Sequence, residues 1–242
     1  MNAMRFRSCA ATHSGAVRSY NEDRFVDRPD VGLWAVADGA GGHQAGEVAS
    51  GMIAEALAAI PDGLPPSLML AEVRARVGRT HEALRDEAAR RGPNTVIAST
   101  VVVLLARDEH FACLWAGDSR VYLLRDGELM QITRDHSFVQ ELVDAGAITP
   151  IEAVNHPRAN VITRALGAQS ETVNLDKTTD RLRSGDRFLL CSDGLSKTMT
   201  EAEIAQMLGL PDPLAPPESL VAAALAKRVN DNVTVVAVDA QP

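Results

Sequence analysis

The sequence lacks several features that would assign it to a familiar class. No apolar run reaches the roughly 18 residues that cross a bilayer, and the first residues contain no hydrophobic core of a signal peptide. The three cysteines form no CxxC pair, and Cys113 and Cys191 lie inside apolar runs. We therefore expect a cytoplasmic chain without a membrane partner, whose cysteines are small core residues in a reducing compartment.

Aromatic and basic residues are also scarce. Only 4% of the 242 residues are aromatic although 46% are hydrophobic, so a sizeable core has to be built from aliphatic side chains. Length and composition fit one globular domain, residues 1–242, and exclude disordered and fibrous classes. The 24 Lys and Arg against 32 Asp and Glu give a formal charge of -8, which disfavours a nucleic-acid partner.

Hydrophobic periodicity predicts helices and strands that do not alternate strictly. Helices are expected at 44–60, 67–91, about 136–146, 201–208 and 219–229, with a proline-rich linker at 211–218. Strands are expected at 5–12, 31–37, 187–193 and 232–239. Between 97 and 132 four strands are predicted to form one antiparallel meander, in which Asp126-Gly127 favours a hairpin turn. This clustering of strands favours an α+β sandwich of sheets flanked by helices.

Three familiar catalytic motifs are absent or incomplete. The glycines at 41 and 46 have P-loop spacing, but Glu47 and Val48 follow where a P-loop needs Lys and Ser or Thr. The stretch at 81–85 resembles HExxH, yet Arg85 replaces the second histidine, so we expect an exposed helix face there. No GxSxG sequence is present.

A recurring arrangement of aspartates is what the sequence does contain. Asp38, Asp118 and Asp193 each follow an apolar strand and have a small residue beside them, and Asp231 comes just before the last strand. Such carboxylates, brought together, would repel one another and raise one another's pKa unless a cation lay between them. All-oxygen ligands favour Mg²⁺ or Mn²⁺ over Zn²⁺. The competing interpretation is that each Asp simply belongs to a turn after a strand.

An arginine precedes two acids near the start of the chain, in the stretch RSYNED at 18–23. The guanidinium of Arg18 is suited to a phosphoryl group, because its planar fork donates two parallel hydrogen bonds and remains charged at all working pH values. On its own, this stretch would be interpreted as a solvated loop.

An ordered set of segments resembles one known family over residues 5 to 239, far more specifically than any single motif does. The segments are RSYNED (18–23), VADGAGGHQAGEVAS (36–50), STVVVLL (99–105), WAGDSRVYLLRDGEL (115–129), TRDHS (133–137), NVITRALG (160–167), LLCSDGL (189–195) and NDNVTVVAV (230–238). They are similar to PP2C metal-dependent protein serine/threonine phosphatases, in the compact bacterial form. The resemblance implies an α-β-β-α sandwich of two antiparallel sheets flanked by helices, with a flap subdomain at about 134–170.

The resemblance also implies roles for individual residues at a binuclear Mn²⁺ or Mg²⁺ centre. Asp38 would bridge both ions, and the carbonyl of Gly39 would bind one of them. Asp193 and Asp231 would complete the shell of the other ion. Asp23 would support the first ion through water, and Asp118 with Asp193 would hold the third ion found in bacterial relatives.

The remaining implied roles concern the substrate. Arg18 would bind the phosphate while a metal-activated water attacks phosphorus, and the flap would select substrates. Many eukaryotic members have a histidine directly after the metal-binding Asp-Gly as proton donor, whereas this chain has Ala40. His43 is a candidate acid in its place, the alternatives being metal-bound water and a purely structural loop histidine. His136 is expected to be structural, between the strands and the flap.

The resemblance therefore predicts a monomeric phosphatase that acts on phosphorylated proteins and reverses a bacterial serine/threonine kinase. Segments 112–127 and 160–168 are similar to phosphatases that accompany bacterial signalling kinases, including those paired with type VI secretion. The alternative is a pseudophosphatase that keeps the fold and binds a partner, although all the acids of the metal site are present. A metal-dependent nuclease conflicts with the net charge and the lack of a basic run.

Overall fold

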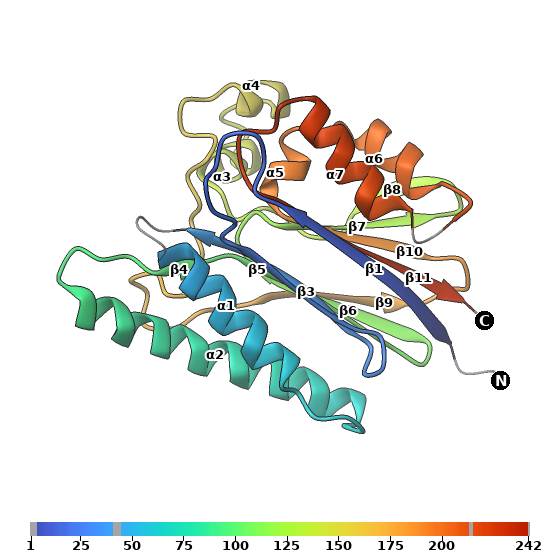
Figure 1. Cartoon of the computed structure of the whole chain (residues 1–242), viewed down its shortest axis with the longest axis horizontal. Helices are drawn as coiled ribbons and strands as arrows, with labels where there is room; N and C mark the ends of the chain where they lie inside the picture. Colours follow the sequence, from blue (N-terminus) through green and yellow to red (C-terminus); the bar gives the residue numbers. More distant parts are fainter. Residues whose placement is uncertain (1–3, 41–44, 213–214, 242) are drawn as a thin grey trace.

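Two antiparallel sheets packed face to face form the centre of the protein, in a computed structural model that describes residues 4–40, 45–212 and 215–241 (Figure 1). The first sheet has the order β1 (Arg5–His13), β11 (Val233–Gln241), β10 (Arg187–Cys191), β7 (Arg120–Arg125) and β8 (Glu128–Gln131). The second has the order β2 (Asp23–Arg28), β3 (Leu33–Ala40), β5 (Val101–Arg107), β6 (His110–Ala116) and β9 (Asp176–Arg181), with the short β4 (Ala98–Ser99) also paired to β3.

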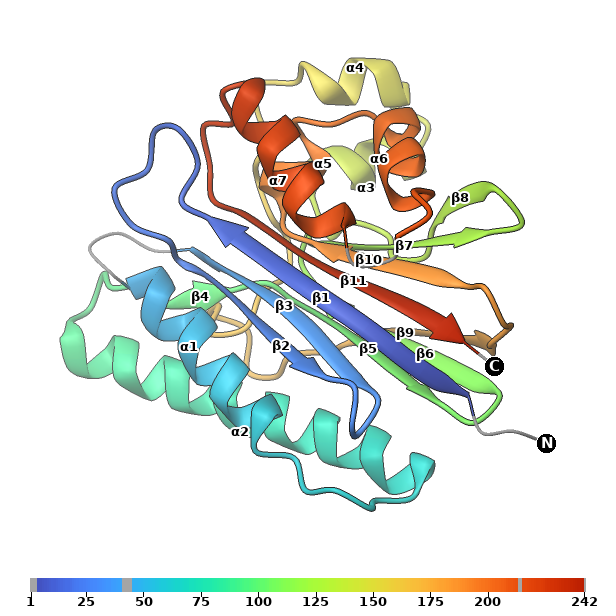
Figure 2. The ribbon, with the colours of Figure 1, turned by 45° about the vertical axis from the view of Figure 1, so that its right-hand side comes forward.

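Helices cover the outer face of each sheet (Figures 1 and 2). The second sheet carries α1 (Ala45–Ala58) and α2 (Pro66–Arg91). The first sheet carries α5 (Asp193–Ser196), α6 (Glu201–Leu208) and α7 (Pro216–Ala226). The segment at 134–170 contains α3 (Phe138–Asp144) and α4 (Pro150–Val154), which lie at one end of the sandwich, far from the two termini. The α+β sandwich of two sheets flanked by helices is confirmed.

Alternation along the central strands explains why they are apolar on both faces. In β3, Trp34 and Val36 point into the layer between the sheets, whereas Leu33, Ala35 and Ala37 pack under α1 and α2. Successive side chains of a strand point to opposite faces, so a strand buried on both sides reads as a continuous apolar run. Phe111 and Phe188 join the two sheets, with ring centroids 4.9 Å apart and an edge-to-face arrangement.

The burial of the cysteines and the apolar character of the helices were both considered from the sequence. Cys113 and Cys191 are fully buried free thiols among apolar side chains, as expected. Cys9 is only partly buried, on the first strand of the sandwich, so the expectation is wrong for it. Within the described ranges, none of the helices combines the length and the apolar character that a bilayer span requires.

The predicted four-stranded meander between 97 and 132 is wrong. The strands β5 and β6 pair in the second sheet and β7 and β8 pair in the first, so the chain changes sheets between β6 and β7. The crossing uses Gly117, whose φ is +118° and whose position leaves no room for a Cβ, which would lie 2.5 Å from the Cβ of Thr100. Hydrophobic alternation cannot distinguish this crossing from a hairpin, because both faces of each strand are buried.

Smaller differences have local causes. Strand β9 is not predicted because its sequence is polar and its side chains are mostly exposed at the sheet edge. Strand β2 is not predicted because four of its six residues are charged. Helix α7 begins inside the expected linker, with Pro216 and Pro217 in its first turn, where proline is tolerated. The expected exposed face at 81–85 is wrong for His81, which is 1% exposed.

Candidate metal centre

The first two aspartates of the site lie opposite each other on neighbouring strands. Asp23 opens β2 and is the cross-strand partner of Asp38, which stands near the end of β3. Directly paired residues in antiparallel strands have Cβ atoms about 4.5–5.5 Å apart. The position of Asp38 is fixed by its main chain, since its carbonyl accepts hydrogen bonds from Thr100 N at 2.9 Å and Ser99 Oγ at 2.9 Å. Two carboxylates are thereby held side by side.

The other three aspartates reach the same end of the sandwich through the topology of the first sheet. Strand β10 is antiparallel to both β7 and β11, and Cys191 at its end faces Arg120 on one side and Val235 on the other. Asp193 follows β10, Asp118 precedes β7, and Asp231 precedes β11. The three therefore lie beyond the same ends of three neighbouring strands. Asp118 arrives there because the chain crosses between the sheets at this point.

The charges of all five carboxylates act on one another. Burial raises the pKa of Asp38 well above its ordinary value, and the negative charges of Asp23, Asp193, Asp118 and Asp231 raise it further. Burial also raises the pKa of Asp23 to about 7, with contributions from Asp193 and Asp231. The pKa of Asp118 is raised to about 6 by burial and by Asp193. A folded chain that concentrates acids in this way needs positive charge to keep them ionised at neutral pH.

Two buried carboxylate oxygens of the cluster lack the partner that a bound cation would supply. In the described part of the chain, Oδ1 of Asp23 and Oδ1 of Asp118 are buried without any hydrogen-bond partner. Their second oxygens do have partners: Ser192 Oγ donates to Asp23 Oδ2 at 2.8 Å, and Lys197 Nζ donates to Asp118 Oδ2 at 3.2 Å. An unpartnered buried carboxylate oxygen is costly, and hard, oxygen-seeking cations such as Mn²⁺ and Mg²⁺ fit this donor set.

The acids do not form a closed cage by themselves. Among the described residues, no group of three or more His, Cys, Asp and Glu side chains meets the geometry of a metal site. Ions held here would therefore take main-chain oxygens and waters alongside the carboxylates, as Mg²⁺ commonly does.

Two basic side chains enter the cluster. Lys197 Nζ lies 2.5 Å from Oδ2 of Asp193 as well as 3.2 Å from Oδ2 of Asp118. Burial alone would lower the pKa of Lys197, but these two carboxylates raise it above its ordinary value. Arg18 Nη2 donates to Asp231 Oδ2 at 2.9 Å, and its side chain is 53% exposed. Arg18 therefore lies at the rim, with its guanidinium accessible from solvent.

Asn232 fixes the loop that carries Arg18 and was not singled out by the sequence. Its Nδ2 donates to the carbonyls of Ser14 and Tyr20 at 3.0 and 2.9 Å, and its Oδ1 accepts from Glu22 N at 2.8 Å. The side chain is buried, so these three bonds tie the start of β11 to both ends of the loop. Its signal in the sequence was only its place directly after Asp231.

The end of β3 lies unusually close to the first turn of α1. A Cβ on Gly46 would lie 2.7 Å from the carbonyl oxygen of Gly39 and 2.8 Å from Oε1 of Glu22, and a Cβ on Gly39 would clash with the main chain of Gly46. Glycine is therefore needed at both positions, and it leaves the Gly39 main chain close to the cluster. Ala40, which comes directly after Gly39, is exposed. His43 lies outside the described residues.

His136 links the strands to the segment at 134–170, as expected for a structural residue. Its Nδ1 accepts a hydrogen bond from Gly117 N at 3.1 Å, and its Nε2 lies 3.1 Å from Oδ2 of Asp176. The ring stacks on Trp115 with a centroid distance of 6.1 Å. His81 anchors the far end of the same segment, since its Nδ1 accepts from Gly167 N and its Nε2 lies 3.1 Å from the carbonyl of Ser170.

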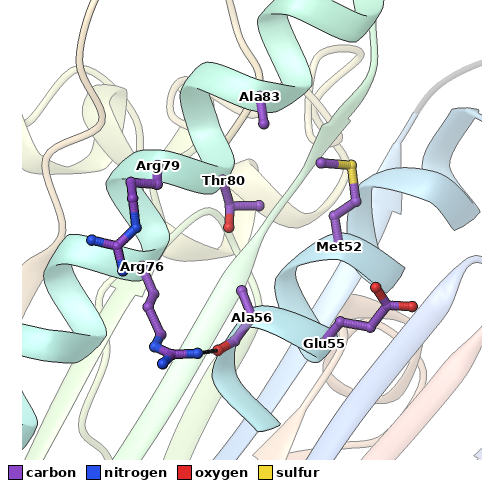
Figure 3. A pocket seen from close by; sticks show the side chains of 7 residues that line it. All are labelled: Met52, Glu55, Ala56, Arg76, Arg79, Thr80 and Ala83. Atoms are coloured by element: carbon purple, nitrogen blue, oxygen red, sulfur yellow. Dashed lines mark hydrogen bonds between the residues drawn. The ribbon is translucent and has the colours of Figure 1, made fainter. Parts of the chain in front are cut away.

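A separate hollow of about 460 Å³ opens between α1 and α2 on the outer face (Figure 3). It is lined by Met52, Arg76, Arg79 and their neighbours, and Arg76 Nη1 donates across it to the carbonyl of Ala56 at 2.8 Å. Its lining contains none of the five aspartates, so the chemistry of the cluster does not use it.

Comparisons with known proteins identify relatives of this chain. The serine/threonine protein phosphatase PstP of Mycobacterium tuberculosis is 41% identical over 233 residues, which are 96% of this chain, although the chain spans only 45% of that relative's length. A solved structure of PppA, described as a key regulatory component of T6SS in Pseudomonas aeruginosa, is 42% identical with a TM-score of 0.90, covering 99% of this chain and 100% of that one.

A further solved structure carries metal. The catalytic domain of PstP in complex with two manganese ions is 39% identical with a TM-score of 0.89, over 99% of this chain and 100% of that one. The family model described as protein phosphatase 2C matches residues 12–227. With two sheets, flanking helices and a cluster of acids at one end, the chain belongs to the protein phosphatase 2C family.

Proposed function

We propose that this protein is a metal-dependent phosphatase that hydrolyses phosphoserine and phosphothreonine in proteins, with Mn²⁺ or Mg²⁺ as cofactor. The observation that carries the proposal is the convergence of five aspartates at one end of the sandwich, two of them with a buried oxygen that has no partner. Family membership and the manganese complex of the related PstP domain support the same conclusion.

The proposed ligands are those that the family resemblance implies, and the structure brings the acids among them to one end of the sandwich. Asp38 would contact both ions, as the family resemblance implies. The Gly39 carbonyl would serve one ion, and Asp193 and Asp231 the other. Asp23 would act through water on the first ion, through the oxygen that has no partner.

The bound ions would supply Lewis acidity, which lowers the pKa of water and offsets the negative charge of a phosphoryl group. The protein's own residues would do the rest. Arg18 would donate from the rim to the phosphate oxygens, and Asn232 would hold the Arg18 loop in register. Asp231 would help to hold an ion, and Arg18, which donates to Asp231 in this structure, would then be available to the anion.

The leaving serine or threonine oxygen needs a proton, and His43 is the proposed donor because Ala40 has no proton to give. A His43→Ala variant should lose activity mainly at the lower pH values of the profile, where the histidine of the wild type is protonated and can donate its proton. An unchanged pH profile would assign the proton to water.

The biological setting is also a proposal. The substrates would be phosphorylated proteins, the flap at 134–170 would select among them, and a bacterial serine/threonine kinase would be opposed. The domain would comprise the whole of 1–242 and act as a cytoplasmic monomer. A link to type VI secretion is suggested by the likeness to PppA.

The test is phosphate release from a phosphothreonine peptide with Mn²⁺, with EDTA, and after Asp38→Asn. The matched control is Asp126→Asn, an exposed acid in the hairpin turn between β7 and β8. We expect activity only with metal, lost in Asp38→Asn and kept in Asp126→Asn. A folded protein without activity in any divalent metal would instead be a pseudophosphatase, and activity that survives EDTA would refute the metal mechanism.

A further inference from the structure

Lys197 lies between Asp118 and Asp193, the two acids to which the family resemblance assigns a third ion. It stands four residues after Asp193, one turn along the chain at α5, and its main-chain N donates to the carbonyl of Asp193 at 2.8 Å. From there its Nζ contacts Oδ2 of Asp193 at 2.5 Å and Oδ2 of Asp118 at 3.2 Å. One ammonium group thus bridges two carboxylates that come from different parts of the fold.

The environment suits a permanent positive charge. The side chain of Asp118 is 3% exposed and that of Asp193 is 17% exposed, so their mutual repulsion is poorly screened by solvent. Lysine carries a compact point charge with three donors, which can be directed at separate acceptors, whereas arginine's flat fork favours a single carboxylate. Lysine is rare in this chain, which has only Lys177, Lys197 and Lys227. One of these three lysines lies among the acids of the cluster.

A tethered ammonium differs from a bound ion in one respect that matters here. It is present at every metal concentration, because it is held by the helix backbone and does not have to be captured from solution. A divalent ion placed between the same two oxygens would have to displace Nζ and would then lie beside a buried positive charge.

We propose that Lys197 replaces a third metal ion between Asp118 and Asp193, so that the protein binds two divalent ions and not the three that the family resemblance implies. The proposal rests on the binuclear centre proposed above. Asp193 would then give one oxygen to Lys197 and the other to the metal centre, and Oδ1 of Asp118, which Lys197 does not contact, would remain available to the two ions of that centre. Lys197 acts as a positioning residue that determines how many ions the site holds.

The experiment counts the ions bound to the full chain by equilibrium dialysis against excess Mn²⁺, with the metal measured by mass spectrometry. Wild type is compared with Lys197→Asp, which replaces the cation by an oxygen ligand, and with Lys197→Met, which removes only the charge. Lys227→Met is the matched control, since Lys227 pairs with Glu203 at 2.7 Å and its side chain is 40% exposed, against 39% for Lys197. Circular dichroism confirms that each variant is folded.

We expect two ions in wild type and in Lys227→Met, and three in Lys197→Asp. Lys197→Met should also take a third ion, about tenfold more weakly than Lys197→Asp, because it has one ligand fewer. Three ions in the wild type would overturn the proposal, and this result needs no variant. A folded Lys197→Asp protein that still binds only two ions would also overturn it. Fewer than two ions in the wild type would refute the binuclear centre itself. That result is therefore distinct from the ones that would refute only the role of Lys197.

Discussion

The raised pKa of Asp23 predicts that the metal-free protein loses stability as the pH rises. Asp23 is 2% exposed, and its pKa is raised from 3.8 to about 7, mainly by burial. The folded state therefore holds this proton more tightly than the unfolded state does. The stabilisation is present in full below the unfolded pKa and is lost as the pH rises through the folded pKa, between about pH 4 and pH 7.

The magnitude follows from that shift in pKa. One unit corresponds to about 1.4 kcal/mol, so ionised Asp23 lowers the free energy of unfolding by up to about 4 kcal/mol. In Asp23→Asn the amide cannot ionise and can still accept the hydrogen bond from Ser192 Oγ. An amide N–H placed at the unpartnered position costs about 1 kcal/mol or more, so the variant should be about 2 kcal/mol more stable than wild type near neutral pH in EDTA.

The assay is urea unfolding followed by circular dichroism from about pH 5 to about pH 8, with EDTA and with Mn²⁺. Taking the difference between wild type and Asp23→Asn cancels the titration of unrelated histidines and acids. In EDTA the wild type should become the less stable of the two as the pH rises, and Mn²⁺ should reverse that order. Equal pH dependence of both proteins in EDTA would refute the claim that this buried acid is strained without a cation.

Three further substitutions test the scaffold of the site. Asn232→Ala removes three hydrogen bonds to the Arg18 loop, so it should cost about 3 kcal/mol in urea unfolding; a cost below about 1 kcal/mol would contradict that role. Gly46→Ala should weaken Mn²⁺ binding in calorimetry by displacing Gly39, whereas Gly51→Ala, which has open space in the same helix, should leave it unchanged and add about 0.5–1 kcal/mol of stability. Arg18→Met should raise KM for a phosphopeptide while changing stability by less than about 1 kcal/mol, because its ion pair is half-exposed; an unchanged KM would remove Arg18 from phosphate binding.

The sequence predicted much of the fold because most helices and strands have regular hydrophobic spacing. The expected helix at 201–208 matches α6 in both bounds, and α2 begins one residue before the expected helix. The meander failed for a physical reason. A strand buried on both faces carries no information about which neighbour it pairs with, so the crossing at Gly117 was invisible. That crossing is also what brings Asp118 to the other acids.

The site was predictable to the extent that it consists of acids beside strand ends. The pairing of Asp23 with Asp38 depends on β2, a strand that the hydrophobic pattern does not predict. Lys197 and Asn232 were missed because their roles depend on contacts with Asp118, Ser14 and other residues far away in the chain. Spacing within one segment cannot report such contacts.

The most direct test of the central claim is a crystal structure of the protein grown with Mn²⁺, with the ions located by anomalous scattering. We predict two strong peaks among Asp23, Asp38, the carbonyl of Gly39, Asp193 and Asp231, with Lys197 still between Asp118 and Asp193. Absence of anomalous density at these acids, in crystals that contain excess Mn²⁺, would contradict the claim that the aspartates form a binuclear metal centre.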